Sequence, residues 1–278
     1  MNIYEETTAR ILQQLEEGVI PWRKTWACGL PASLRTGREY RGVNILILSA
    51  AGFSSRYWVT FREALRLGGN VRRGQKATRI IYWHWRTPEE LATLQEQSGK
   101  ADLAPCVPFS SAVFNLDQLD GVSAPRHCPT ANHDERLERA DGLFGTMPDK
   151  PEIVHSTMHE PSYSACEDRI ALPHLSQFES ADEYYATFFH ELVHASGHVR
   201  RLNRRAGQEG DAIERYSFEE LVAEFGAAFL CGFACINNAE TEKLAASYIH
   251  GWAQSLRSDP RLVLRAASAA QQIGRAHV

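Results

Sequence analysis

Apolar residues recur three and four positions apart near both ends of the chain, which is the spacing of amphipathic helices. Residues 3–17 follow this pattern and end before Pro21, a residue type that interrupts helices. Towards the C-terminus the same spacing predicts three more helices, over residues 218–235, 239–256 and 260–274. Both ends of the chain are therefore predicted to be helical.

A further helix is predicted between Ser180 and Gly197. Ser180 and Glu183 have the spacing of an N-terminal capping box, in which polar side chains satisfy free backbone N–H groups. Gly197 is a residue type that commonly ends helices. The apolar stripe between these ends consists of Tyr185, Phe188, Phe189, Leu192 and Val193.

Runs of β-branched and aromatic residues predict strands between the helices. The predicted strands are residues 79–85, 107–116, 152–155 and 169–172. Residues 87–106 are polar and without periodicity, so they are predicted to form a loop between two strands.

The expected fold class is α+β with two domains. Turn-forming residues over 120–132 predict a linker. We therefore expect a small basic α/β domain over residues 1–128, followed by a mainly helical domain over residues 129–278.

The two halves of the chain carry opposite charge. The net charge of −4 combines +8 over residues 1–86, where 14 Lys and Arg face 6 Asp and Glu, with −12 over residues 87–278. Five of the six tryptophans also lie within the first 86 residues. This asymmetry indicates that the two halves have different partners.

A basic segment rich in aromatic residues is typical of proteins that bind single-stranded DNA, because cations neutralise phosphates and rings stack on bases. The candidate stacking residues are Trp22, Trp26, Tyr40, Tyr57 and Trp58. The candidate phosphate-binding residues are Arg35, Arg38, Arg41, Arg72, Arg73 and Lys76. About half of the tryptophans are expected to lie in the core instead, since aromatic residues dominate ordinary cores.

The composition disfavours a membrane or secreted protein. No run approaches the roughly 18 apolar residues of a transmembrane helix, so no membrane partner is expected. The N-terminus lacks the basic and then apolar order of a signal peptide. The six cysteines include no C-x-x-C pair and are too sparse for a disulfide scaffold. We expect a cytoplasmic protein in which Cys231 and Cys235 are small core residues.

Residues 190–194 read His-Glu-Leu-Val-His, an H-E-x-x-H motif, on the helix predicted after Ser180. Residues four apart share one face of a helix, so His190 and His194 can bind the same metal ion. Glu191 lies beside that ion, where a general base can take a proton from water. The motif therefore predicts one divalent ion, with Zn²⁺ expected, and Glu191 as the catalytic base. The alternative is a core helix with two surface histidines.

A catalytic zinc site needs a third protein ligand. We assign Glu220 to this role and Glu224, four residues later, to orienting a ligand histidine. The assignment stays open, because Ser217 and Glu220 also fit a helix capping box. In that case Glu219, Glu220 and Glu224 would all be helix-end charges.

His198 is the other candidate ligand. Residues 190–198 resemble the metzincin zinc motif up to Gly197, but that motif has its third histidine three residues after the glycine, where Arg200 stands. His198 is therefore expected to be a partly exposed histidine near the helix end.

Two groups of motifs resemble known domains. The first resembles the single-stranded-DNA-binding domain of ArdC-type plasmid antirestriction proteins, which is related to domains of TraC-type plasmid primases. It consists of PW at 21–22, YRGVN at 40–44, YWVT at 57–60, RGQK at 73–76 and VFN at 113–115. The second resembles their zincin-like metallopeptidase domain and consists of DRIALP at 168–173, HELVH at 190–194 and EELVAE at 219–224.

The resemblance implies a protein that binds single-stranded DNA and shields incoming conjugative plasmid DNA from host restriction. It also implies a metal-dependent, peptidase-like domain whose protein substrate is undefined. In a peptidase, residues 168–173 would be the strand that aligns the substrate backbone. The alternative is a non-enzymatic protein that occludes DNA and whose metal site is only structural. The base Glu191 favours hydrolysis, since structural zinc sites usually have four Cys and His ligands.

Overall fold

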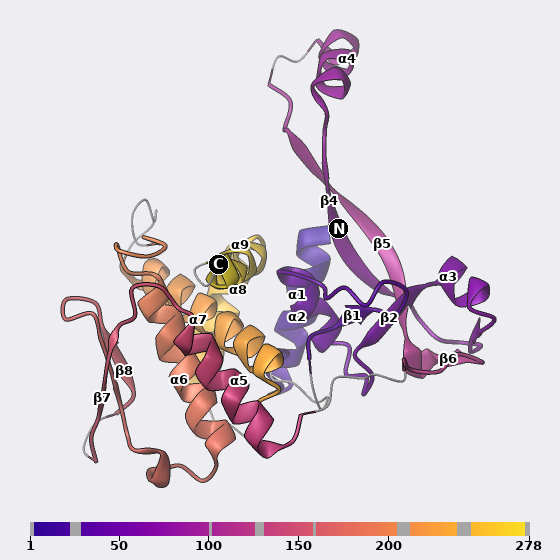
Figure 1. Cartoon of the computed structure of the whole chain (residues 1–278). Helices are drawn as coiled ribbons and strands as arrows, with labels where there is room; N and C mark the ends of the chain where they lie inside the picture. The colour runs from indigo at the N-terminus through magenta and orange to yellow at the C-terminus, as the bar shows by residue number, and fades with distance from the viewer. Residues whose placement is uncertain are drawn as a thin grey trace.

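The structure is a computed structural model of the chain, and it describes residues 3–22, 29–99, 102–125, 131–157, 160–204, 212–237 and 246–275. Figure 1 shows a sheet with a long projecting hairpin in the N-terminal half and a group of helices flanked by a small sheet in the C-terminal half. The predicted α+β fold class is confirmed.

Each helix and strand predicted above is present to within a few residues, except over residues 87–106 and at the start of the helix predicted over residues 218–235. The helix His133–Gly145 and the strand Ser162–Ser164 lie where no element was predicted. The α-helices within the described residues are α1 (Ile3–Glu16), α2 (Val43–Ser49), α3 (Phe61–Arg66), α4 (Pro88–Ser98), α5 (His133–Gly145), α6 (Ala181–Ser196), α7 (Ala212–Ala234), α8 (Ala246–Ser258) and α9 (Leu262–Gln271). The strands are β1 (Ala32–Ser33), β2 (Tyr57–Thr60), β3 (Asn70–Val71), β4 (Thr78–Trp85), β5 (Cys106–Asn115), β6 (Leu119–Asp120), β7 (Glu152–His155), β8 (Ser162–Ser164) and β9 (Arg169–Leu172). Single 3₁₀ turns lie at Leu116–Gln118, Leu175–Gln177 and Gln272–Arg275. The part of the predicted fourth helix before residue 246 lies outside the described residues.

The N-terminal sheet has the strand order β1-β2-β5-β4, so β1 and β4 are its edges. β4 and β5 pair antiparallel from Thr78 opposite Val113 to Trp85 opposite Cys106. Their outer half leaves the body of the protein and carries α4 at its tip (Figure 1). We call residues 82–109 the arm. α2 packs against β4 at the base of the arm.

The loop predicted over residues 87–106 is wrong, because most of this segment is the helix α4. Its N-terminus has a complete capping box: Thr87 Oγ1 accepts from the N–H of Glu90, and the Glu90 carboxylate accepts from the N–H of Thr87. Gly99 ends the helix in the left-handed region, with φ of 66°. None of its residues is buried, and its apolar residues, Leu91, Ala92 and Leu94, are too few to form the stripe by which helices are recognised in a sequence.

The second sheet has the order β7-β9-β8 and lies beside α6 (Figure 1). β9 is parallel to β7 and antiparallel to β8, so it is hydrogen-bonded along both sides. The expectation that residues 168–173 align a substrate strand is therefore wrong, since β9 has no free edge. β8 is the edge strand that contacts α6.

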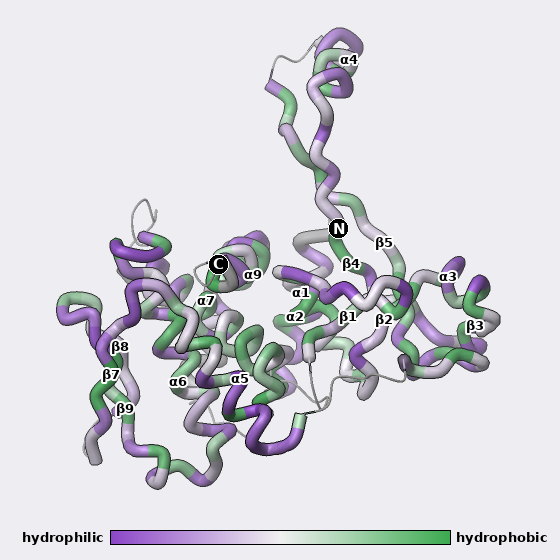
Figure 2. The backbone as a smooth tube through the Cα atoms, in the orientation of Figure 1, coloured by the Kyte–Doolittle hydropathy of each residue, from purple (hydrophilic) through white to green (hydrophobic). Residues whose placement is uncertain are grey.

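The two halves of the chain share one hydrophobic core among the described residues. α1 packs against α8, and α2 packs against α9. Trp22, shortly after α1, meets Phe225 of α7 and Trp252 of α8 edge to face, with ring centroids 4.8 and 5.4 Å apart. Figure 2 shows hydrophobic stretches on the central helices and hydrophilic ones at the tip of the arm. A division at residues 128 and 129 stays a prediction, but the core continues across it.

Two expectations from composition can be compared with the structure. Among the described residues, no helix is both long and apolar enough to cross a bilayer. Cys231 and Cys235 are buried, as expected for small core residues. Cys235 is also disulfide-bonded, which the spacing of the cysteines did not predict.

Candidate metal centre

α6 carries the H-E-x-x-H motif and is fixed in position at both ends and along one face. It begins after Ser180, whose Oγ accepts a hydrogen bond from the N–H of Glu183 at 3.1 Å, and its C-cap is Gly197. Phe189 and Leu192 are fully buried where α6 packs against α7. This packing determines which face of α6 is left to carry the two histidines.

α7 places Glu220 opposite these histidines. Nε2 of His190 and Nε2 of His194 lie 3.2 Å apart. The carboxylate oxygens of Glu220 lie 3.6 Å from His190 Nε2 and 3.5 Å from His194 Nε2. In a tetrahedral site with bonds of about 2.0–2.1 Å, ligand atoms are roughly 3.3–3.4 Å apart. The three side chains therefore fit a divalent ion held between them.

The start of α7 decides between the two interpretations of Glu220. α7 begins at Ala212, so Ser217 lies in its second turn and cannot be its N-cap. Glu220 is consequently not part of a capping box at a helix end. Its carboxylate faces the histidines instead.

Each histidine has a second carboxylate behind it. Nδ1 of His190 lies 3.4 Å from Glu224, and Nδ1 of His194 lies 3.7 Å from Glu219. Glu219 is itself held by the guanidinium of Arg204 at 2.6 Å. Carboxylates in such positions orient a metal-binding imidazole and increase its basicity. The contact of Glu219 with His194 was not foreseen, because the sequence does not reveal which of three nearby glutamates faces which histidine.

The carboxylates set the acid–base properties of the site. Burial by itself lowers the pKa of His190, but hydrogen bonds to Glu220 and Glu224 outweigh it and raise the pKa to about 10. Burial raises the pKa of Glu220, yet its hydrogen bond to His190 and the charges of the histidines lower it overall. A metal ion that binds here must displace the proton of His190, so metal binding competes with protonation.

Glu191 lines a cavity of about 550 Å³ together with the metal-binding set. Burial raises the pKa of Glu191 above its ordinary value. The backbone N–H of Tyr163, on the edge strand β8, donates a hydrogen bond to the Glu191 carboxylate. Arg215 and Tyr216, from the first turns of α7, also line the cavity. The metal-binding set, a carboxylate with raised pKa and a strand edge thus meet in one cleft.

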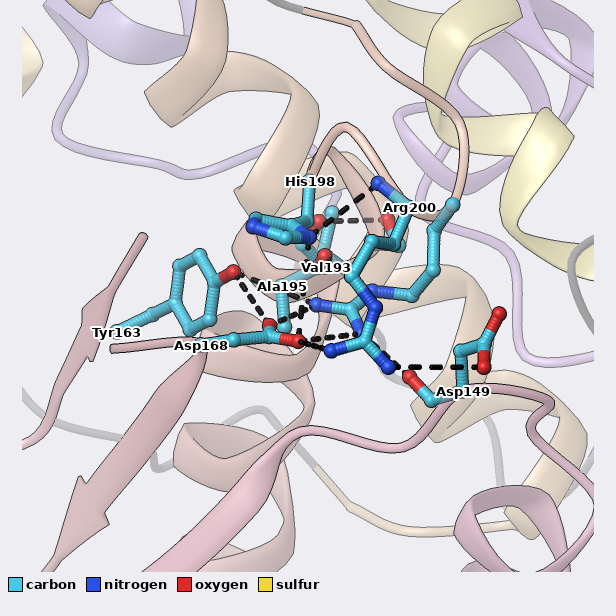
Figure 3. A network of polar contacts seen from close by, with 9 residues as sticks. Asp149, Tyr163, Asp168, Val193, Ala195, His198 and Arg200 are labelled. Carbon is cyan, nitrogen blue, oxygen red and sulfur yellow. Dashed lines mark hydrogen bonds and ion pairs between the residues drawn. The ribbon is translucent and has the colours of Figure 1, made fainter. Parts of the chain in front are cut away.

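Asp168 holds the loop after α6 against the small sheet (Figure 3). Arg201 forms a two-pronged ion pair with Asp168, and its Nε donates to the carbonyl of Ala195 at 2.7 Å. The hydroxyl of Tyr163 donates to the same carboxylate at 2.8 Å. These contacts fix β8 beside α6 and so place the N–H of Tyr163 at Glu191.

His198 belongs to this network rather than to the metal-binding set. Its Nδ1 lies 3.9 Å from Asp168 and accepts a hydrogen bond from the N–H of Arg200 at 3.3 Å (Figure 3). Within the described residues, the group that could hold a metal consists of His190, His194 and Glu220.

Trp22, from the N-terminal half, contacts the metal centre. Trp22 is only 2% exposed, and its Nε1–H donates to Glu224 Oε2 at 3.0 Å. The other oxygen of this carboxylate faces His190. A ring packed in this way cannot stack on a base, so the predicted DNA contact of Trp22 is wrong.

We expect Trp22→Phe to weaken metal binding, because phenylalanine keeps the aromatic packing but loses the hydrogen bond that orients Glu224. The loss should be smaller than the roughly 10- to 100-fold loss expected for Glu224→Gln, which changes the group beside the imidazole. Calorimetric titration with Mn²⁺ measures both affinities, and circular dichroism checks the fold. Wild-type affinity in Trp22→Phe would show that this hydrogen bond does not support the site.

Two more predicted stacking residues are corrected by their burial. Tyr57 and Trp58 on β2 are 6% and 1% exposed, so neither ring is accessible to a base. Trp26 lies outside the described residues. Tyr40 is half-buried, and its contact with DNA stays a prediction.

The six candidate phosphate-binding side chains are all at the surface. They are Arg35, Arg38, Arg41, Arg72, Arg73 and Lys76. Arg72 already donates to the carbonyl of Asp117, so it is partly committed to the fold. DNA contact by these cations stays a prediction.

The exposed rings of the N-terminal half lie mainly on the arm and were not predicted. Tyr82, Trp83 and Trp85 on β4 are 49%, 47% and 69% exposed, and Phe109 on β5 is 55% exposed. The sequence identified this segment as a strand. It could not show that the strand leaves the body of the protein halfway along, which exposes both of its faces.

The chain matches two protein families. Residues 1–114 match the N-terminal domain of anti-restriction factor ArdC, and residues 132–269 match a zincin-like metallopeptidase. Two crystal structures of the antirestriction ArdC protein from plasmid R388, one metal-free and one Mn(II)-bound, are 32% and 30% identical to this chain. Each covers 100% of this chain and 97% of its own, with TM-scores of 0.77 and 0.75. The Mn(II)-bound structure supports a divalent metal in this fold.

Two curated relatives differ greatly in length. A DNA primase TraC from Escherichia coli is 34% identical over 97% of this chain, which spans only 26% of the primase. The uncharacterized protein y4eC from Sinorhizobium fredii (strain NBRC 101917 / NGR234) is 33% identical over 98% of this chain and 90% of its own length. The resemblance to ArdC and to TraC primases noted in the sequence is thereby confirmed.

Proposed function

Since the chain belongs to the ArdC family of antirestriction proteins and has a zincin-like metallopeptidase domain, we propose that it protects incoming plasmid DNA from restriction in the cytoplasm by binding it as a single strand. We propose that the C-terminal half also hydrolyses a protein substrate with a divalent ion held by His190, His194 and Glu220. Zn²⁺ is the expected ion, and Mn²⁺, which an ArdC relative binds, is the alternative.

One observation supports hydrolysis: Glu191 lines the same cleft as the metal-binding set. A divalent ion held by His190, His194 and Glu220 would supply a Lewis acid that polarises a scissile carbonyl and activates water. In this mechanism Glu191 takes a proton from the attacking water and gives it to the leaving amine. Glu219 and Glu224 hold the two imidazoles in the orientation that binding requires.

We assign the alignment of a peptide substrate to β8. It is an edge strand, and Ser162 and Tyr163 on it line the cleft. An extended peptide can add to such an edge through main-chain hydrogen bonds. We assign to β8 the role that was predicted for residues 168–173, because both sides of β9 are occupied.

We expect Glu191→Gln to bind metal with nearly wild-type affinity but to lose hydrolysis by about 10²- to 10⁴-fold, because only the proton acceptor is removed. The assay is cleavage of β-casein, an unfolded protein, by metal-loaded wild type and variant, with the fragments identified by mass spectrometry. A chelator-treated wild type is the control. Equal cleavage by wild type and variant would contradict the role of Glu191.

Protection of DNA is tested by conjugative transfer of a plasmid that encodes this chain. Wild type should increase transfer into recipients with a restriction system and leave transfer into restriction-deficient recipients unchanged. Glu191→Gln separates protection by hydrolysis from protection by occlusion. Full protection by this variant would favour the alternative of a DNA-occluding protein whose metal is structural.

A further inference from the structure

A groove of about 650 Å³ lies where the base of the arm approaches α9. One wall is β4, a second is the segment leading into α2, and the third is α9 with the turn that follows it. Both halves of the chain therefore line it. Its volume lies within the range of ligand-binding clefts, roughly 300–1,000 Å³.

Three large rings line this groove and remain exposed to solvent. They are Tyr82, Trp83 and Trp85, and Tyr40 lies beside them, with its side chain hydrogen-bonded to Tyr82. Exposed apolar groups gathered in one place mark binding sites more often than scattered ones do. Flat rings in an open groove offer the surface on which unpaired bases stack, whatever the base.

The groove has fixed walls. Asn44 of α2 donates from Nδ2 to the carbonyl of Ile81 at 2.7 Å and accepts from the N–H of Ile81 at 2.8 Å, which holds β4 to α2. The N–H of Gly42 donates to Gln271 Oε1 at 2.8 Å, which holds the segment before α2 to α9. A ligand that enters such a groove does not have to order its walls, so less free energy is lost on binding.

The charge of the groove favours a polyanion. Its charged side chains are Glu39 and Arg41. Glu39 is neutralised by Arg56, with N and O 2.7 Å apart. Arg41 is exposed and forms no ion pair within the described part of the chain. On the opposite wall, Ser268 and Gln272 offer neutral hydrogen-bonding groups.

We propose that this groove holds the bases of single-stranded DNA, a proposal that rests on the DNA binding proposed above and gives it a location. Trp83 and Trp85 stack on neighbouring bases, and Arg41 contacts a phosphate. The polar side chains of α9 meet the base edges. Duplex DNA binds poorly, because its bases are stacked on one another and unavailable to the rings. The C-terminal half therefore takes part in DNA binding. This differs from the expectation that the N-terminal half alone binds DNA and the C-terminal half alone binds metal.

The test is fluorescence anisotropy of a labelled oligothymidylate with the full chain, measured over a range of salt concentrations. Trp83→Ala and Trp85→Ala should each weaken binding about 5- to 150-fold and leave the salt dependence unchanged. Arg41→Gln should weaken binding and reduce the log–log salt slope by about 0.7. Thermal melting confirms that each variant is folded.

Two matched controls separate the groove from its surroundings. Phe109→Ala removes a similarly exposed ring from the other strand of the arm, outside the groove. Its affinity for the oligonucleotide should stay within about twofold of wild type, well below the loss expected for each tryptophan variant. Ser268→Glu adds a negative charge to the α9 wall and should weaken binding. Gln254→Glu adds the same charge on an exposed position of α8 and should not.

The outcomes distinguish this proposal from the function on which it rests. If the wild type does not bind the oligonucleotide, both the DNA-binding function and the groove are rejected. If the wild type binds and the Trp83, Trp85 and Arg41 variants bind equally well, the groove is rejected, and the DNA binds at another surface of the protein. Equal losses in Phe109→Ala and the tryptophan variants would assign binding to the arm as a whole. A duplex bound as tightly as the single strand would reject stacking.

Discussion

His190→Ala should reduce metal binding from one divalent ion per chain to almost none. His190 supplies one of three ligand atoms, and its loss leaves a histidine and a carboxylate that cannot enclose an ion. Substitution of residues that only orient a ligand weakens metal binding by up to roughly 100-fold. The loss in His190→Ala should be larger, because the ligand itself is removed. Equilibrium dialysis with Zn²⁺ and Mn²⁺, followed by elemental analysis, measures the bound metal directly.

His198→Ala is the matched control, because it removes a histidine from the same region that contacts Asp168 instead of Glu220. It should keep its metal. A metal concentration of about 1,000 times the dissociation constant should stabilise the folded state of wild type and of His198→Ala by about 4 kcal/mol. The melting temperature of these two proteins should rise accordingly, and that of His190→Ala should not. Equal metal loss in the two variants would show that the ligand assignment is wrong.

Arg201→Ala should destabilise the fold by about 3–5 kcal/mol, although Arg201 touches no metal ligand. Its side chain is 2% exposed and pairs with Asp168, which is 14% exposed. The substitution removes the buried, two-pronged cation from a nearly buried carboxylate and one of the donors to the carbonyl of Ala195. The measurement is chemical denaturation at neutral pH, supported by a fall in melting temperature on the order of 10 °C.

The neighbouring residue gives the control for this effect. Arg200 also faces Asp168, at 3.6 Å, but is 58% exposed, so Arg200→Ala should cost at most about 1 kcal/mol. Similar decreases in the free energy of unfolding of both variants would mean that burial does not strengthen the Arg201–Asp168 ion pair.

The Arg201 effect should also depend on pH. Burial raises the pKa of Asp168, but hydrogen bonds from Arg201 and Tyr163 outweigh it and lower the pKa overall. A carboxyl with a lowered pKa in the folded state stabilises the fold above its unfolded pKa, about 3.9. That contribution is lost as the pH falls through the lower, folded value. The difference between wild type and Arg201→Ala should therefore be complete at pH 7 and shrink in acid.

The sequence by itself determined the metal-binding helix. The end signals at Ser180 and Gly197, the apolar stripe and the four-residue spacing of His190 and His194 are all local features. In a helix, local spacing fixes which side chains share a face, so these residues specify two ligands and a neighbouring base without further information. The long strands β4 and β5 followed from β-forming runs for the same reason. The helix α4 was missed because it has end signals but no buried face.

The tertiary structure decided everything that depends on contacts between distant segments. Glu220 faces the histidines because α7 crosses α6 closely at Gly226, where a Cβ atom would lie 2.7 Å from Val193 Cγ2. No pattern in the sequence gives the rotation of one helix against another. Which side chains are buried is also decided by tertiary packing. Trp22 lies in the core beside Glu224, whereas Trp85 projects into solvent on the arm. A tryptophan is the same residue in both places, and its role follows from the segments that pack around it.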